Sequence, residues 1–99
     1  MSRYFLVARV RGRAWDQGRA RREQPGWDEH AAFMDALVAE GVVLLGGPVG
    51  EGDGEEALLV VDAESEAEVR ARLAADPWGE DMLVTESVRP WSVWLGGLA

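Results

Sequence analysis

A chain of 99 residues provides one domain with a single hydrophobic core, near the lower end of the size range that is comfortably stable. Its formal net charge of −8 argues against nucleic acid or an anionic membrane as the main target, since both require a basic surface. Cysteine and lysine are both absent, which excludes disulfides, thiolate chemistry and Schiff-base lysines.

The first predicted element is a strand over Tyr4–Arg11, where side chains alternate with a period of two. Phe5, Val7 and Arg9 share one side of this strand. A polar stretch at residues 12–24 follows and holds several of the arginines. A solvated basic loop is the simplest interpretation of this stretch, and an anion-binding clamp is the alternative.

The next predicted element is a helix that starts at Pro25-Gly26 and runs to about Glu40, where Gly41 ends it. At about 100° per residue, the unique histidine, His30, lies at the centre of its apolar stripe. The side chains that share this stripe are Trp27, Ala31, Phe33, Met34, Leu37 and Val38. A histidine in this position is either packed and bonded to backbone carbonyls, or directed into a pocket for chemistry.

Two aliphatic runs at residues 42–45 and 57–61 predict the strands of a hairpin, with its turn near Asp53-Gly54. The loop between them is rich in glycine and acidic residues, and it joins two strands. A phosphate-binding loop would lead into a helix instead. Gly46 and Gly47 therefore either form the bend of the hairpin or let the backbone approach a ligand.

A second helix is predicted from the capping box that Ser65 and Glu68 form, and it ends near Ala75 because Pro77 cannot continue it. Residues 82–89 predict the last strand. A tail that contains Trp91 and Trp94 follows.

This β-α-β-β-α-β order predicts an α+β, ferredoxin-like domain over residues 1–99, with a four-stranded antiparallel sheet and both helices on one face. The middle strands are apolar on both sides, whereas a sheet face in contact with water is normally polar. We therefore expect a homodimer that forms through the open sheet faces.

Several short motifs, taken in order, resemble the YCII-related (YciI-like) domain family over nearly the whole chain. These motifs are Trp27-Asp28-Glu29-His30, Leu37, Gly41, Leu45-Gly46-Gly47-Pro48, Asp76-Pro77-Trp78 and Arg89-Pro90-Trp91. The resemblance implies a dimeric α+β barrel with an active site around a histidine and an aspartate, here His30 and Asp76. Some relatives are associated with dehydrochlorination of hydroxylated aromatic rings, and the barrel also supports muconolactone isomerases and cofactor-independent monooxygenases. Such fold kinship is an analogy and assigns no reaction.

The positions of His30 and Asp76 support a pair independently of the resemblance. His30 lies near the start of its helix, where the positive end of the dipole favours a neutral ring. Asp76 follows the second helix, and in this fold the start of one helix can approach the end of the other. Capping of the turn before Pro77 is the alternative role of Asp76.

Our first hypothesis is a small-molecule enzyme in which His30 is the general acid or base, and Asp76 orients it or shuttles its proton. Arg9 would bind a substrate carboxylate or phenolate, unless it forms an ion pair at the surface. The predicted walls of an apolar pocket are Trp27, Phe33, Met34 and Trp78, and Gly46 and Gly47 would let the backbone approach the ligand. The expected chemistry is isomerisation or elimination on a cyclic or aromatic acid, without a cofactor.

The second hypothesis keeps the same barrel as a non-catalytic module for small-ligand binding or assembly. A metal site is not expected, since one histidine and no second acid on its helix face make a poor ligand set. No apolar stretch is long enough to cross a bilayer, and the first residues lack the layout of a signal peptide. These features predict a cytoplasmic protein with no membrane or nucleic-acid partner.

Overall fold

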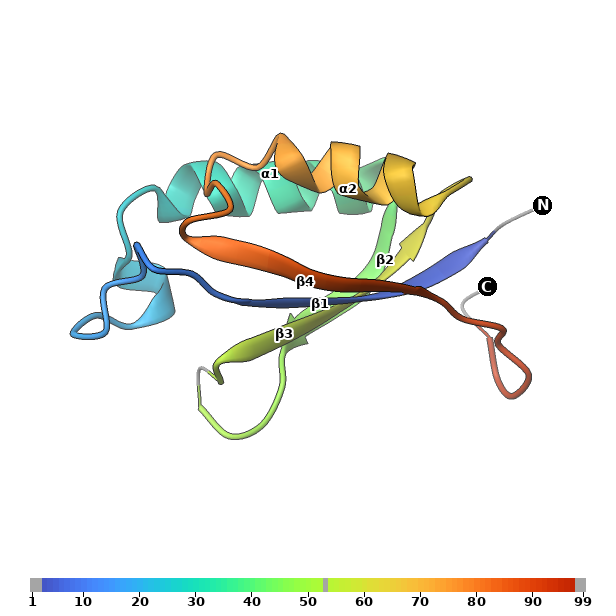
Figure 1. Cartoon of the computed structure of the whole chain (residues 1–99), viewed down its shortest axis with the longest axis horizontal. Coiled ribbons are helices and arrows are strands. Elements are labelled where there is room, and N and C mark those ends of the chain that lie inside the picture. The colour runs from blue at the N-terminus through green and yellow to red at the C-terminus, as the bar shows by residue number, and fades with distance from the viewer. Residues whose placement is uncertain (1–2, 53, 98–99) are drawn as a thin grey trace.

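The computed structural model describes residues 3–52 and 54–97, which fold into a layer of helices on a layer of sheet (Figure 1). The elements in chain order are β1 (Tyr4–Arg11), the 3-10 helix η1 (Arg21–Glu23), α1 (Trp27–Ala39), β2 (Val43–Pro48), β3 (Glu56–Asp62), α2 (Glu66–Ala74) and β4 (Leu83–Pro90). The predicted α+β, ferredoxin-like order is therefore confirmed.

The sheet has four antiparallel strands in the order β2-β3-β1-β4, so β1 pairs with both β3 and β4. Both helices cover the same face (Figure 1). A bulge interrupts the β1–β4 ladder, because Ala8 lies opposite Ser87 whereas Arg9 lies opposite Thr85. The extra residue on β4 allows buried Thr85 and Val88, three positions apart, to lie on the helix-covered side.

The main core, between the helices and the sheet, is aliphatic apart from one phenylalanine. Its buried members are Phe5, Val7, Leu37, Val43, Leu59, Val61, Ala63, Val69, Leu73 and Val88. They come from both helices and from each strand, and their removal from water is the main favourable contribution to folding. A second cluster of Trp15, Trp78 and Leu83, with Trp27 and Met82 against it, lies apart from this core.

The predicted helix signals act locally as expected. Ser65 Oγ accepts a hydrogen bond of 3.1 Å from the Glu68 N–H and caps α2. Glu68 Oε2 in turn accepts the Glu64 N–H. Gly41, which has a φ of 78°, follows the end of α1 in the left-handed conformation that glycine adopts without strain.

Three sequence predictions need correction. Gly46, Gly47 and Pro48 belong to β2 and pair with β3, although the sequence placed them in the loop of the hairpin. Gly46 permits this pairing, because a Cβ there would lie only 2.9 Å from the backbone carbonyl oxygen of Leu58. The stretch at residues 12–24, predicted as a loop, contains the short helix η1. Val38, which the sequence placed on the apolar stripe of its helix, is 52% exposed, because the buried face of α1 is narrower than that stripe. Asp53, in the predicted turn, lies outside the described residues.

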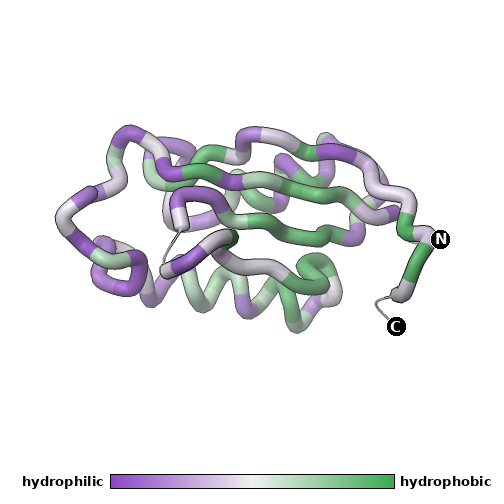
Figure 2. Tube along the Cα trace, turned by 90° about the horizontal axis from the view of Figure 1, so that it is seen from below, coloured by the Kyte–Doolittle hydropathy of each residue, from purple (hydrophilic) through white to green (hydrophobic). Residues whose placement is uncertain are grey.

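The central strands β3 and β1 are hydrophobic along much of their length (Figure 2). Within residues 3–52 and 54–97, no helix covers the other face of the sheet (Figure 1). Leu6 pairs with Val60, and Ala8 pairs with Leu58, on this face. The predicted dimer through this face remains a prediction. Within residues 3–52 and 54–97, no helix combines the length and the apolar character that crossing a membrane requires.

Candidate active site

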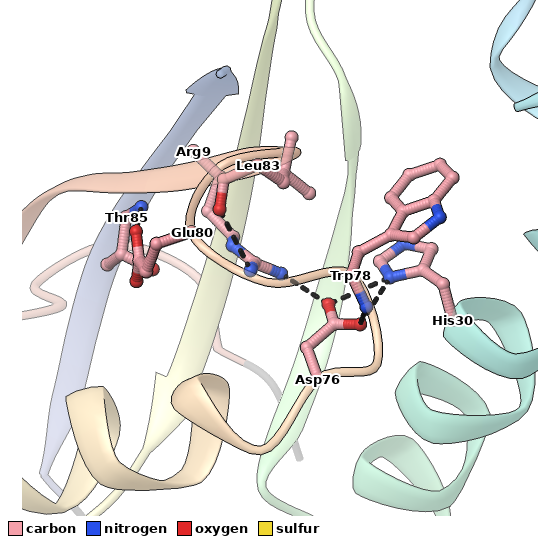
Figure 3. Close-up of polar contacts among 7 residues, drawn as sticks. All are labelled: Arg9, His30, Asp76, Trp78, Glu80, Leu83 and Thr85. Atoms are coloured by element: carbon pink, nitrogen blue, oxygen red, sulfur yellow. Dashed lines mark hydrogen bonds and ion pairs between the residues drawn. The ribbon is translucent and has the colours of Figure 1, made fainter. Parts of the chain in front are cut away.

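A histidine and a carboxylate from distant parts of the sequence meet at one end of the helical layer (Figure 3). His30 lies on the second turn of α1, and Asp76 lies just after α2. His30 Nδ1 is 2.9 Å from Asp76 Oδ1 and 2.8 Å from Asp76 Oδ2. The structure therefore brings together the two residues that the sequence proposed as a pair.

Asp76 is held by two further donors. Arg9 Nη1 donates to Asp76 Oδ2 at 2.9 Å, and the Trp78 N–H donates to Asp76 Oδ1 at 2.8 Å. Asp76 thus caps the turn at Pro77 and also contacts His30. The side chain of Asp76 has no exposed surface and that of Arg9 is 2% exposed, which makes their ion pair a buried one. The surface ion pair considered for Arg9 is therefore wrong.

These contacts determine the charge of Asp76. Burial by itself would raise the pKa of the carboxyl group. Hydrogen bonds from His30 and Arg9, attraction to His30 and the Trp78 N–H outweigh burial, so the pKa of Asp76 lies below its usual value. Asp76 is therefore a carboxylate near neutral pH.

An ionised carboxylate accepts hydrogen bonds and cannot donate them, which determines the tautomer of His30. Nδ1 must carry the proton that points to Asp76, so the neutral ring keeps its lone pair on Nε2. Among residues 3–52 and 54–97, no hydrogen bond to Nε2 occurs. Nε2 is accordingly the atom available to a ligand.

Trp78 fixes the plane of the histidine ring. The two rings stack with centroids 4.0 Å apart and an interplanar angle of 11° (Figure 3). Trp78 Nε1 donates to the Pro25 carbonyl at 2.8 Å, and Trp15 packs edge-on against the indole. Trp78 is buried behind His30 and does not line the adjoining cavity, which corrects its predicted place in the pocket wall.

A cavity of about 220 Å³ adjoins the imidazole on the helix-covered side of the sheet. Its described lining residues are Arg9, Arg21, Trp27, His30, Met34, Gly46, Gly47, Pro48, Ala57, Leu59 and Leu83. This lining includes five of the residues that the sequence proposed for ligand contact, namely Arg9, Trp27, Met34, Gly46 and Gly47. Phe33 instead packs against the main core, because it lies on the edge of the stripe that faces the aliphatic layer.

Sequence reasoning missed Arg21 and Gln24, which it assigned to a solvated loop. Arg21 is buried and lines the cavity, with its guanidinium carbon 5.2 Å from the Trp15 ring centroid. The buried Gln24 side chain bonds the backbone of Asp16 and Arg19. An irregular segment has no periodicity that separates buried from exposed residues, and the only available signal was Trp15 within an otherwise polar stretch.

A second hollow, of about 780 Å³, lies between the start of β1, the start of α2 and the tail around Trp91 and Trp94. It lacks a histidine among its described lining residues. Within the described part of the chain, no three histidine or acidic side chains gather in a way that would hold a metal ion.

Comparisons with known proteins agree with this architecture. The sequence pattern of the YCII-related domain family matches residues 4–92. A solved structure of 5-chloro-2-hydroxyhydroquinone dehydrochlorinase from Burkholderia phenoliruptrix AC1100, in complex with 2,5-dihydroxybenzoquinone, superposes with a TM-score of 0.60. The two sequences are 24% identical over 95% of each chain, so this likeness concerns the fold. No curated protein matches the sequence.

Proposed function

Since the chain belongs to the YCII-related domain family, we propose that it is a small-molecule enzyme in which His30 transfers a proton and Asp76 orients the ring. The observation that carries this proposal is the buried His30–Asp76 contact beside a cavity. A neutral imidazole with Nδ1 bonded to a carboxylate presents a basic Nε2 and gains stabilisation when it becomes charged.

The proposed step is removal of a proton from an activated carbon or hydroxyl of the ligand. Nε2 takes the proton while the electron pair of the broken bond forms a new double bond in the ligand. In an isomerisation the electron pair of an adjacent double bond shifts to another carbon, which takes the proton back from the imidazolium, and in an elimination a leaving group departs with the electron pair of its bond to the ligand. Asp76 accepts three donors, so we assign it to orientation and charge stabilisation rather than to proton shuttling.

The size of the cavity supports a small cyclic substrate. A volume of about 220 Å³ is below the roughly 300 to 1,000 Å³ typical of drug-sized ligand pockets, so a single ring fits better than a fused system. The apolar walls from Trp27, Met34 and Leu59 suit an aromatic or alicyclic ring. The structural neighbour was solved with a single-ring quinone, which is consistent with this size. No cofactor enters the proposed step.

The test begins with a thermal-shift screen of aromatic acids and lactones, followed by turnover assays on the compounds that bind. Replacement His30→Gln should lower kcat about 10²- to 10⁴-fold, the usual contribution of a general acid or base. Glu29→Gln, at the exposed neighbouring position of α1, is the matched control and should leave kcat unchanged. Turnover that survives His30→Gln would remove the proposal.

The alternative is a module that binds the same ligands without converting them. The buried Arg9–Asp76 pair gives this alternative some support, since it braces the cavity whether or not chemistry follows. The unique His30 separates the two functions, because its ring protons can be followed by NMR without assignment. A ligand that shifts these signals and is recovered unchanged after long incubation across the whole screen would favour the module.

We also propose a homodimer through the open sheet face, and a cytoplasmic location, both as predicted from the sequence. Light scattering should give twice the mass of one chain at micromolar concentration. Leu58→Glu, on the open face, should shift the mass to that of a monomer, whereas Glu86→Gln, at an exposed position of β4, should not. A stable wild-type monomer would refute the dimer.

A further inference from the structure

We infer that Arg9 is a positioning residue whose buried charge compensates that of Asp76, so that His30 remains a neutral base near neutral pH. This inference rests on the proposed function, because it assigns a further residue to the same proton-transfer step. Arg9 acts on the ring through Asp76, which both side chains contact. It does not belong to the family motifs that the sequence carries.

Arg9 lies on an inner strand of the sheet, where a charged side chain is unusual. Its partners across the two ladders are Ala57 on β3 and Thr85 on β4. The side chain is 2% exposed, and Nη2 donates to the Leu83 carbonyl at 3.4 Å. Among the described residues, Arg9 Nε has no hydrogen-bond partner. A buried guanidinium that is incompletely bonded costs stability, so stability alone does not account for an arginine at this position.

Three groups lie in a row with the carboxylate of Asp76 at the centre. Arg9 Nη1 donates to Asp76 Oδ2 at 2.9 Å, and His30 Nδ1 is 2.8 Å from the same oxygen. Figure 3 shows the carboxylate between the guanidinium and the imidazole. The charges of Arg9 and Asp76 sum to zero, so the ring lies beside a compensated pair rather than beside a lone anion.

The charge of Arg9 matters because a lone carboxylate next to an imidazole favours the imidazolium form. A ring that is already protonated has no lone pair on Nε2, so it cannot take a proton from a ligand. Without Arg9, Asp76 would direct its full charge at His30, and the ring would hold its proton to a higher pH. With Arg9 in place, the carboxylate still orients the ring while the neutral form persists.

The other charged groups around the ring are also known. Arg21, on η1, lines the same cavity and has contacts of its own. Asp28 and Glu29 precede His30 on α1 and are exposed, so water and salt screen their charges. These three side chains are unchanged in every variant below. Differences between the variants therefore report the charge of Arg9.

The test follows the pH titration of the His30 ring signals by NMR in the full chain, without a ligand. Arg9→Met has a similar length and no charge, and it should raise the midpoint by about one pH unit or more, the effect of one neighbouring charge. Arg9→Lys keeps the charge and should titrate closer to the wild type than Arg9→Met does. Arg13→Met removes the same charge from an exposed position after β1, and this matched control should shift the midpoint by less than about 0.3 pH unit.

An unchanged or lower midpoint in Arg9→Met, an equal shift in Arg13→Met, or an Arg9→Lys variant that titrates like Arg9→Met would overturn the inference. If Arg9→Met does not fold, the wild type decides through the nitrogen-15 shifts of the His30 ring at pH 7. One protonated and one unprotonated nitrogen are expected. A doubly protonated ring would overturn the inference as well.

These readouts concern the free protein, so they remain valid if His30→Gln shows that the protein is not an enzyme. Where turnover is found, the pH at which kcat/KM reaches half its maximum should rise in Arg9→Met by the same amount as the NMR midpoint. A kcat/KM that falls equally at every pH would show that Arg9 has a structural role alone, which also contradicts the inference.

Discussion

The two clusters of buried side chains in this small domain differ in composition. The buried members of the main core are aliphatic apart from Phe5, and they lie between the helices and the sheet. The second cluster consists largely of tryptophans, and it surrounds Arg9, His30 and Asp76, which are buried polar groups. The first cluster therefore stabilises the fold through apolar burial alone, whereas the second also has to keep charged groups paired.

The same helix contributes one residue to the aliphatic core and another to the candidate site. Helix α1 contributes Leu37 to the aliphatic core and His30 to the site, two turns apart. Burial of ions is costly, and a purely structural core would not need the buried Arg9–Asp76 ion pair that lies beside His30. Mutations in the two clusters should therefore have different signatures.

The largest expected effect on stability is at Asp76. Asp76→Asn leaves the Arg9 guanidinium buried without its counter-charge, and we expect a loss of about 3 to 5 kcal/mol in the free energy of unfolding. Urea denaturation measures this loss. Asp35→Asn, on the exposed side of α1, is the control and should change the free energy by less than about 0.5 kcal/mol. Equal stability of the two variants would mean that the pair is not buried in solution.

A smaller effect is expected in the aliphatic core. Leu37→Ala removes a fully buried side chain and should cost about 3 kcal/mol, while the His30 ring signals keep their chemical shifts. Val38→Ala, at the exposed next position, should cost much less. A change at the His30 ring comparable to that in Asp76→Asn would contradict the separation of the two clusters.

The smallest expected effect is on the pH dependence of stability, which should appear only in acid. The pKa of Asp76 is lower in the folded protein than its ordinary value of 3.8, so the unfolded chain binds the proton first as the pH falls. The stability that Asp76 provides is thus complete above this ordinary value and is lost as the pH falls through the lower folded pKa. Unfolding measured from pH 6 downward should show the wild type converging toward Asp76→Asn. Parallel curves would mean that Asp76 is not the group that titrates.

Much of the fold could be predicted because its signals are local. The alternation over β1, the capping box at Ser65 and the glycine after α1 each act within a few residues, and their elements lie where the sequence placed them. Residues 46–48 were missed as strand because their pairing depends on how closely the Leu58 carbonyl approaches Gly46. Such a contact between two strands is invisible in the local sequence pattern.

The site was only partly predictable for a related reason. The position of His30 on its helix indicated its burial, and the family motifs indicated Asp76. For the third member, Arg9, the sequence left a ligand contact and a surface ion pair open, because strand periodicity gives the side of the strand but neither its burial nor its partner. Arg21 begins the three-residue 3-10 helix η1 and Gln24 directly follows it, and so short an element has no periodicity that distinguishes buried from exposed positions.

The side chains that contact Asp76 come from distant parts of the sequence. Arg9 is 67 positions away from Asp76 along the sequence, and His30 is 46 positions away. No fragment that lacks either the first strand or the segment after the second helix contains the complete triad. The reactive centre therefore exists only when the entire polypeptide has collapsed, so regain of ligand conversion during refolding would report completion of the whole topology.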